Sequence, residues 1–555
     1  MVLSTTHLMR ILVLIAFLLF TFSSYSQNGS FNRADSLRGH LNQWRSCYDV
    51  TFYELHVKVD PEAQAISGSN IISYKAVEDF FRLQIDLYEN MTIDKIEQDG
   101  RSLNYQRDGN AIFVDFEEKQ PKGSLGSLKV TYHGEPKVAV NPPWDGGFVW
   151  DKDKNGTPWV AVACEGIGAS LWWPNKDHPS DEPDSMSIMV DAPLGLTCVS
   201  NGQLMSKRRV PGNYDQWSYF VSYPINNYNV TLNLGDYAFF SDHYEYKDGE
   251  KLKLKYFVLN YNLKKAIQQF KQVKDMMSCF EKLYGKYPYL LDGYTLVETP
   301  YWGMEHQSAI SYGNDYKNNN FGFDFIIVHE SSHEYWGNSI SYTDHAELWI
   351  HEAMATYTDA LFVECKYGHD QGQLYLDSLK TMIKNKTPIL GPKEVNYKGW
   401  KDADMYYKGA WMMHSIRNTI HDDILWFNIL EELYQEFKYS NIESKDIIEF
   451  INEHAHHNLT HIFNQYLKYP SPPKFVYWIE NKGKKSTLHY KWTVDEPDFH
   501  MPIRIKVHEK DAYITLHPSS DFQIKTFEIK DLDKIWLDEE SFYFIEDHMS
   551  AEAFD

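Results

Sequence analysis

Cysteine is scarce in this sequence of 555 residues. The five cysteines are scattered and include no C-x-x-C pair, which excludes a disulfide-dense scaffold. In an exported protein one or two disulfides would form and at least one thiol would stay free, and the spacing does not say which residues pair. The five are Cys47, Cys164, Cys198, Cys279 and Cys365.

The chain also lacks an excess of positive charge and several binding motifs. Its formal net charge is −23, which disfavours binding to nucleic acid and to anionic membranes. No basic patch is interleaved with aromatic residues, so nucleic-acid binding has no support. No glycine-rich phosphate loop precedes a predicted helix, and the G-x-S-x-G signature of serine hydrolases is absent.

Long hydrophobic runs are missing as well, apart from a short one at the start. Arg10 precedes residues 11–22, which are apolar except for Thr21, and small residues follow before Gln27. This layout predicts a secretory signal peptide over residues 1–26. The run is shorter than the roughly 20 residues of a membrane span. We therefore expect export, either to a periplasm or out of the cell, without stable insertion into a membrane.

Aromatic residues are abundant, at 15% of the chain, which suits β-rich cores and substrate clefts. Residues 53–59 and 83–87 alternate polar and apolar side chains, as half-buried strands do. Together with frequent turn signals, this pattern predicts an antiparallel β domain over residues 27–260.

Helical periodicity dominates the next part of the chain, residues 261–470, with short strands between the helices. This pattern predicts an α+β domain. The breaker cluster Pro470-Ser471-Pro472-Pro473 ends it. Short alternating runs then predict a small C-terminal β-sandwich over residues 471–555, so the fold class is multidomain α+β. Helices are expected at residues 264–284, 324–336, 347–365, 373–384 and 403–420.

The strongest chemical signal is His329-Glu330-Ser331-Ser332-His333. On a helix, residues four apart share a face, so both imidazoles point at one ion. Eighteen residues separate His333 from Glu352, which supplies a third ligand. Three protein ligands and an open fourth position are typical of a catalytic zinc, one per chain. Glu330 then lies beside the metal as the general base for zinc-activated water.

Further motifs give the chain a resemblance to a known family. With Trp302-Gly303-Met304-Glu305-His306-Gln307 upstream, it resembles the gluzincin zinc aminopeptidases of the aminopeptidase N and leukotriene hydrolase-aminopeptidase type. The likeness covers nearly all of the mature chain and implies a thermolysin-like catalytic domain. Other matching segments are Trp173-Pro174-Asn175-Lys176-Asp177, Trp336-Gly337-Asn338 and Tyr406-Tyr407-Lys408-Gly409.

The resemblance implies roles for individual residues. Gly303, Met304 and Glu305 match the family's exopeptidase motif, whose glutamate binds the free α-amine of the substrate. Glu165 lies where the family often has a second amine-binding residue. Tyr406 matches the tyrosine that donates a hydrogen bond to the developing oxyanion. Tyr407 is its neighbour and competes for this role, although the register to the following Lys-Gly favours Tyr406.

The exopeptidase motif departs from the family at two positions. Trp302 replaces a glycine, and we predict that it narrows the cleft or covers the first side-chain pocket. His306 replaces an asparagine, and we predict that it adds a charge that titrates near neutral pH. Close to Glu352, the histidines His345 and His351 are interpreted as structural.

The sequence therefore predicts a zinc aminopeptidase whose partners are peptides with a free N-terminus. The first alternative is a thermolysin-like zinc endopeptidase, against which Glu305 and Glu165 argue because an endopeptidase has no free amine to bind. The second is a catalytically silent scaffold on the same fold, against which the complete set of ligands, base and tyrosine argues. An additional epoxide hydrolase activity stays open, as does the preferred N-terminal residue.

Overall fold

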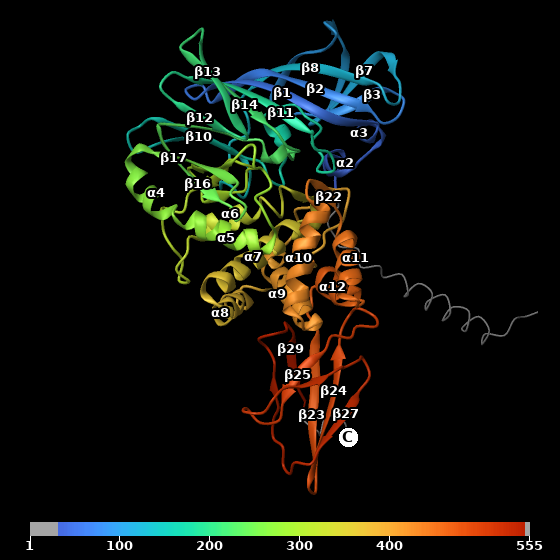
Figure 1. Cartoon of the computed structure of the whole chain (residues 1–555). Coiled ribbons are helices and arrows are strands. Elements are labelled where there is room, and N and C mark those ends of the chain that lie inside the picture. Colours follow the sequence, from blue (N-terminus) through green and yellow to red (C-terminus); the bar gives the residue numbers. More distant parts are fainter. Residues whose placement is uncertain (1–30, 550–555) are drawn as a thin grey trace, which may run out of the picture.

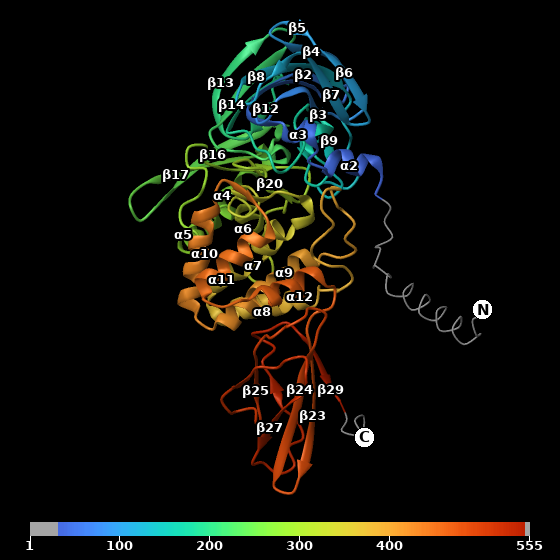
Figure 2. The ribbon, with the colours of Figure 1, turned by 90° about the vertical axis from the view of Figure 1, so that its right-hand side faces the viewer.

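The computed structural model describes residues 31–549, which form three parts stacked in a row (Figure 1, Figure 2). A β-rich part lies at one end, a mostly helical part in the middle and a small β-sandwich at the other end. This arrangement confirms the predicted multidomain α+β fold class. The predicted signal peptide lies outside the described residues. Between residues 31 and 549, none of the helices combines the length and the apolar character that a membrane crossing requires.

The N-terminal part is built around an eight-stranded sheet in the order β13-β14-β11-β1-β2-β8-β4-β5. In β1 (Tyr48–Asp60), Leu55, Val57 and Val59 are fully buried and alternate with more exposed residues, as the sequence predicts. β1 pairs antiparallel with β2 (Ala65–Ala76) and parallel with β11 (Ser185–Pro193). The other strands of this sheet are β4 (Met91–Gln98), β5 (Arg101–Ser102), β8 (Leu125–Gly134), β13 (Gln203–Val210) and β14 (Tyr214–Val221).

Two smaller sheets and two short helices complete this part. One sheet has the order β12-β15-β10-β9 and the other β3-β7-β6. Their strands are β9 (Gly147–Lys152), β10 (Pro158–Ala163), β12 (Thr197–Ser200), β15 (Leu232–Gly235), β3 (Phe80–Asp86), β6 (Asn104–Asp108) and β7 (Ala111–Gln120), and the helices are α2 (Arg33–Gly39) and α3 (Gln43–Ser46).

The middle part opens with a five-stranded sheet in the order β16-β17-β18-β20-β19. β16 (Tyr237–Glu245) and β17 (Lys251–Leu259) precede residue 260 in the sequence but pair within this sheet, β17 being parallel to β18 (Tyr294–Glu298). β20 (Ile310–Tyr312) joins β18 to the edge strand β19 (Gly303–Met304). The edge strand of this sheet therefore carries Gly303 and Met304 of the exopeptidase-like motif.

Helices form the rest of the middle part (Figure 1). The helix expected at 264–284 is divided into α4 (Leu263–Gln269) and α5 (Gln272–Leu283), and the one expected at 324–336 is the shorter α6 (Phe325–Ser332). The others are α7 (Trp349–Tyr367), α8 (His369–Lys380), α9 (Asp404–Ile420), α10 (Asp423–Phe437), α11 (Ser444–Ala455) and α12 (Thr460–Lys468), with β21 (Ile340–Tyr342) paired to β22 (Ser440–Ile442).

One disulfide crosslinks this helical part. Cys279 on α5 bonds to Cys365 near the end of α7, and the bond closes a loop of 86 residues in sequence separation. A crosslink over so long a loop restricts the unfolded chain and so favours the folded one. Cys47, Cys164 and Cys198 are free and buried, which resolves the pairing that the sequence left open.

The C-terminal sandwich packs a four-stranded sheet, β27-β24-β23-β29, against a three-stranded sheet, β26-β25-β28. Lys408 on α9 holds the segment between α12 and this sandwich, because its Nζ donates to the carbonyl oxygens of Tyr469 and Pro470. The strands are β23 (Lys474–Lys482), β24 (Lys485–Thr493), β25 (Ile503–Lys506), β26 (Ile514–Leu516), β27 (Gln523–Phe527), β28 (Trp536–Leu537) and β29 (Ile545–His548).

The buried cores show where the parts meet. The core of the sandwich is continuous with that of the helical part. The N-terminal part has its own core, and this core includes Tyr301 and Met304 from the edge of the middle sheet. The segment around β19 is thus hydrogen-bonded to one part and packed into the other. It lines the cleft between them.

Candidate metal centre and substrate cleft

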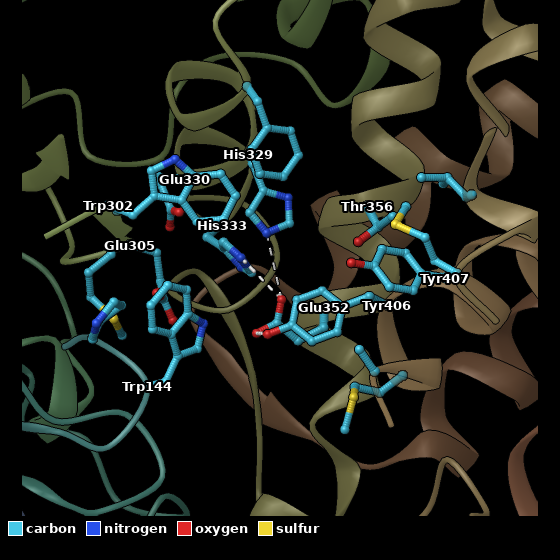
Figure 3. Close-up of a pocket in the computed structure, with 18 of the residues that line it drawn as sticks. Trp144, Trp302, Glu305, His329, Glu330, His333, Glu352, Thr356, Tyr406 and Tyr407 are labelled. Atoms are coloured by element: carbon cyan, nitrogen blue, oxygen red, sulfur yellow. Dashed lines mark hydrogen bonds and ion pairs between the residues drawn. The ribbon is translucent and has the colours of Figure 1, made fainter. Parts of the chain in front are cut away.

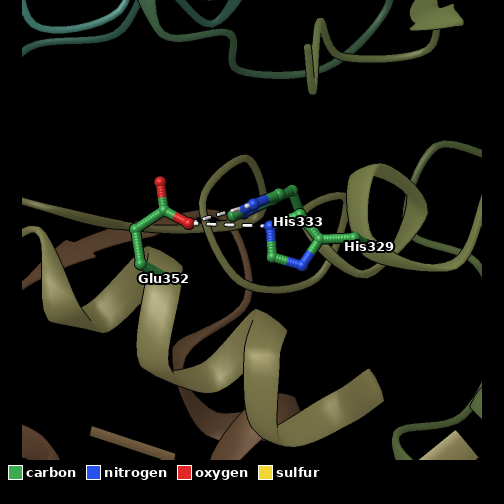
Figure 4. Close-up of side chains that lie close together, drawn as sticks. All are labelled: His329, His333 and Glu352. Carbon is green, nitrogen blue, oxygen red and sulfur yellow. Dashed lines mark ion pairs between the residues drawn. The ribbon is translucent and has the colours of Figure 1, made fainter. Parts of the chain in front are cut away.

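Two helices bring together the three predicted metal ligands (Figure 4). His329 lies on α6, His333 caps its C-terminus, and Glu352 lies on the first turn of α7. Glu352 Oε2 is 3.7 Å from His329 Nε2 and 3.5 Å from His333 Nε2. All three side chains are buried, with ligand atoms within 4.8 Å of one another.

This donor set fits a zinc ion. Ligand atoms bound tetrahedrally at 2.0–2.2 Å lie about 3.4 Å apart, close to the two separations found between Glu352 and the histidines. Glu352 Oε2 is buried and has no hydrogen-bond partner among the described residues, so one acceptor faces the centre unsatisfied. Two imidazole nitrogens and one carboxylate oxygen are donors that zinc accepts well.

The remaining ring nitrogens of both histidines are held by other groups. His329 Nδ1 lies 2.9 Å from Asp359 Oδ2, and His333 Nδ1 lies 2.9 Å from the carbonyl oxygen of Trp336. Such partners fix the ring orientation and leave Nε2 for the metal. Burial opposes protonation of His329, but the surrounding carboxylates, led by Asp359, together outweigh it and raise the pKa of His329 well above its usual range.

Glu330 lies beside the triad and against the edge strand. A Cβ atom added at Gly303 would lie 2.5 Å from Glu330 Oε1, so only a glycine lets the strand approach the carboxylate this closely. Burial raises the pKa of Glu330 well above its ordinary value, and the nearby carboxylates of Glu305 and Glu352 add to the effect. A raised pKa makes the carboxylate a stronger proton acceptor, as a general base requires.

Two further carboxylates, Glu305 and Glu165, lie near the triad. Glu305 follows β19, and its Oε1 accepts a hydrogen bond of 3.0 Å from the hydroxyl of Tyr228. Glu165 follows β10, and its Oε1 is 4.0 Å from Nδ1 of the buried His351. Acceptor atoms of Glu165, Glu305 and His351 all lie within 4.8 Å of one another. Burial raises the pKa of both glutamates and neighbouring carboxylates raise it further, against the opposing effect of the two histidines of the triad.

Two carboxylates and an imidazole can together accept the N–H groups of an ammonium ion, because charge-assisted N–H···O bonds to carboxylates form at about 2.8 Å. The sequence predicted only a structural role for His351. In the structure this residue is fully buried beside the two carboxylates, a placement that the sequence alone does not reveal.

The structure separates the two neighbouring tyrosines. Tyr406 on α9 donates a hydrogen bond of 2.8 Å to Glu352 Oε1, and burial raises the pKa of its hydroxyl well above the usual value, so it stays protonated. Tyr407 lines the same cleft without a comparable contact to the triad. Gly409 permits this placement, because a Cβ there would lie 2.5 Å from that of Ala353 on α7.

These residues line one cleft of about 1020 Å³ (Figure 3). Tyr406 and Tyr407 lie on the opposite side of the triad from Trp302 and Glu305 in this view. Trp302 is 44% exposed to the cleft and stacks on Phe325, with ring centroids 5.5 Å apart. Trp302, which we predicted to narrow the cleft, therefore packs on the first residue of α6, the helix that carries His329.

The expectation for His306 is wrong. The side chain is fully buried, its Nδ1 contacts Ser311 Oγ at 3.1 Å, and burial lowers its pKa to about 3. A group in this position stays neutral near pH 7 and does not reach the cleft. The sequence motif placed His306 beside Glu305, but successive residues of an extended chain point in opposite directions.

Comparison with known proteins agrees with this geometry. Residues 268–466 match the model of the peptidase family M1 domain. Mouse aminopeptidase B is 21% identical over 369 residues, covering 62% of this chain and 53% of its own. Probable aminopeptidase 1 of Sulfurisphaera tokodaii is 21% identical over 456 residues, covering 78% and 55%. This chain thus spans about half the length of these relatives.

Solved structures show the same fold. A mutant M1 zinc metallopeptidase from Deinococcus radiodurans, bound to a Tyr-Ser-Ala substrate, superposes with a TM-score of 0.64 at 16% identity, covering 76% of this chain and 94% of its own. Legionella pneumophila aminopeptidase A, in complex with aspartic acid, gives a TM-score of 0.74 at 16% identity, covering 91% and 60%. Residues 268–466 therefore resemble a peptidase family M1 domain, and the chain has the fold of the M1 zinc metallopeptidases.

Proposed function

We propose that this chain is a zinc aminopeptidase that removes N-terminal residues from peptides. The observation that carries the proposal is the pair of carboxylates beside the His329–His333–Glu352 triad, the buried one of Glu305 and the partly buried one of Glu165. A buried carboxylate needs a cationic partner, and the α-ammonium of a peptide supplies one. Because the acceptors lie next to the metal centre, only the first peptide bond can reach it.

The metal in this proposal is one zinc ion per chain, held by His329, His333 and Glu352. Zinc bound there supplies Lewis acidity, which polarises a carbonyl group and lowers the pKa of a water molecule. The chain's own residues position the substrate, because Glu305 and Glu165 bind and orient its amine.

Glu330 moves the proton. Its carboxylate takes a proton from the attacking water as the oxygen bonds to the peptide carbonyl carbon, and returns it to the amine nitrogen as the C–N bond breaks. The Tyr406 hydroxyl donates to the oxyanion that develops on the carbonyl oxygen. In the structure this hydroxyl already points at the triad, through Glu352 Oε1.

The proposal is tested with alanine arylamide and its N-acetyl counterpart, using wild type and Glu305→Ala, with and without a zinc chelator. Only the free-amine substrate should be hydrolysed, and the chelator should stop the reaction. Loss of a buried partner for the ammonium should lower kcat/KM of the variant about 100-fold. Glu118→Ala, at an exposed position on β7, is the matched control and should behave as wild type.

Two other outcomes would replace the proposal. Equal hydrolysis of the blocked substrate would favour an endopeptidase and would remove the role given to Glu305. No hydrolysis at any zinc concentration would favour a catalytically silent scaffold.

We further propose that the protein is exported, to a periplasm or out of the cell. The predicted signal peptide over residues 1–26 motivates this, and the disulfide between Cys279 and Cys365 supports it, because such bonds persist in oxidising compartments. N-terminal sequencing of the protein from separated cell fractions should show a start near Gln27 outside the cytoplasm. An intact Met1 in the cytoplasmic fraction would contradict the proposal.

A further inference from the structure

Three aromatic side chains that line the cleft form a continuous surface, which we call the aromatic wall: Trp144, Trp302 and Phe325. Figure 3 shows Trp144 and Trp302 on the same side of the metal triad. The Trp302 ring stacks on Phe325 at an interplanar angle of 24°, and Trp144 lies 6.4 Å from Trp302 between centroids. Phe325 stacks in turn on the metal ligand His329 at 4.9 Å. The wall thus extends from the metal centre to the mouth of the cleft.

This wall is open to solvent, unlike most large apolar side chains. Trp144 is 66% exposed and Trp302 is 44% exposed. Both nevertheless have fixed surroundings. The Trp302 indole N–H donates to Asn314 Oδ1 at 3.2 Å, and the Trp144 loop is closed by backbone N–H groups of Val140 and Asn141 that donate to Asp145. An ordered aromatic surface in a cleft can bind an apolar group of a ligand.

The order of residues along the edge strand shows which part of a substrate meets the wall. Glu305 marks the position of the α-amine. Gly303, two residues earlier, lies against Glu330, the group that returns a proton to the leaving nitrogen. Trp302 is one residue further in the same direction, at most about 10 Å from Glu305 along extended chain. The wall therefore lies beyond the bond that is cut, on the side of the leaving peptide.

We propose that the aromatic wall binds the side chain of the second residue of the peptide and selects an aromatic one. This inference rests on the proposed aminopeptidase function and adds a specificity for the leaving side. Successive Cα atoms are 3.8 Å apart, so the second side chain starts just past the metal and reaches Trp302 and Phe325. Aromatic rings gain from offset-stacked or edge-to-face contact in addition to buried area.

The test compares peptides that share their first residue and differ in the second. Wild type should hydrolyse Ala-Phe-Ala-Ala with a kcat/KM about tenfold or more above that for Ala-Gly-Ala-Ala, the ratio expected from about 1.4 kcal/mol of ring contact. Trp302→Ala should remove most of this preference and lower kcat/KM for the phenylalanine peptide much more than for the glycine peptide. Trp302→Phe keeps a ring and should restore much of it.

A matched control is Phe239→Ala. This residue on β16 is 53% exposed, its ring packs at a tilt against Phe257 with centroids 4.9 Å apart, and it does not line the cleft. It should keep the wild-type preference. A second peptide pair, Phe-Ala-Ala-Ala and Ala-Ala-Ala-Ala, varies the first residue instead, and its ratio should not change in Trp302→Ala.

The outcomes separate the two proposals. If wild type hydrolyses none of the peptides, the aminopeptidase function itself fails. If it trims them without regard to the second residue, or if Trp302→Ala alters the preference for the first residue instead, the function stands and the inference about the aromatic wall is overturned. If Trp302→Ala does not fold, the kcat/KM ratios of wild type and of Trp302→Phe decide the question.

Discussion

Two groups of side chains in the cleft are built in opposite ways: the carboxylate end, made of Glu165, Glu305 and Glu330, and the aromatic wall. Glu305 and Glu330 are buried, Glu165 is partly buried, and Glu165 Oε1 has no hydrogen-bond partner among the described residues. The rings of Trp144 and Trp302 are 66% and 44% exposed and rest on neighbouring aromatic rings. The carboxylate end therefore favours a cationic ligand, whereas the wall offers mainly apolar surface.

The difference indicates how reaction and selectivity are divided in this molecule. Burying a charge without a partner is unfavourable, so the carboxylate end discriminates strongly between ligands that bring a positive charge and those that do not. An apolar surface discriminates only weakly, by about one to three kcal/mol between similar side chains. Changes at the carboxylate end should therefore have much larger effects than changes at the wall.

The largest effect on activity is expected when the carboxylate end loses its proton acceptor, Glu330. Glu330→Gln keeps the shape of the side chain but cannot accept a proton, so kcat should fall about 10³- to 10⁴-fold. KM should change little, because the amine acceptors and the aromatic wall remain. Steady-state kinetics with a free-amine peptide and zinc analysis of the purified variant test this. A kcat within tenfold of wild type, with zinc bound, would show that another group carries the proton.

The second largest effect on kcat is expected at Tyr406, and its neighbour Tyr407 lines the same cleft and serves for comparison. Tyr406→Phe removes the hydroxyl that points at Glu352 and should lower kcat about 10²- to 10³-fold. Tyr407→Phe, its matched control, should retain most of the activity. If the two variants lose activity equally, or Tyr407→Phe loses more, the assignment of the donor to Tyr406 is wrong.

A smaller effect concerns metal affinity instead of the chemical step. Asp359→Asn weakens the acceptor for His329 Nδ1, and loss of such a partner typically reduces metal affinity about 10- to 100-fold. Competition with a zinc chelator of known affinity measures the change, with Asp370→Asn on α8 as the exposed control. Restoration of activity by added zinc is expected. Unchanged affinity would show that the histidine does not depend on Asp359.

The smallest effect tests a residue that lies behind the carboxylate end. Burial lowers the pKa of His306 to about 3, below its usual 6.5, so the folded protein binds fewer protons than the unfolded chain between these values. Its contribution to stability is therefore full above pH 6.5 and is lost as the pH falls toward 3. His306→Asn should reduce the slope of unfolding free energy against pH by up to about 1.4 kcal/mol per unit.

Urea denaturation of both proteins at a series of pH values measures this slope. Parallel curves for wild type and His306→Asn would mean that His306 is protonated in the folded state after all.

Spacing along the chain was enough to predict which side chains meet at the metal centre. The i,i+4 histidines have a fixed geometry on one helical turn, and Glu352 needs only a second helix crossing the first. Asp359 could have been found by the same rule, since it lies seven residues after Glu352 on one face of α7. Helix periodicity also located α7 and α9 to within two residues at either end.

Contacts between distant segments could not be predicted in this way. The break between α4 and α5 falls near Phe270, where the sequence has neither glycine nor proline to predict it. Phe270 packs there against Tyr256 and Tyr312 from other elements. The meeting of Trp144 with Trp302 depends on how two parts of the fold are placed. The burial of His306 depends on the direction in which an edge strand faces.

The packing of Tyr301 and Met304 into the core of the N-terminal part has a consequence for the protein as a whole. The three predicted metal ligands all come from the helical part. Glu165 and Tyr228 come from the N-terminal part, and the segment carrying Glu305 is held between the two. If the proposed function holds, a helical fragment made alone would keep the metal ligands and lose part of the amine site. The β-rich part would then be what limits cleavage to the first peptide bond.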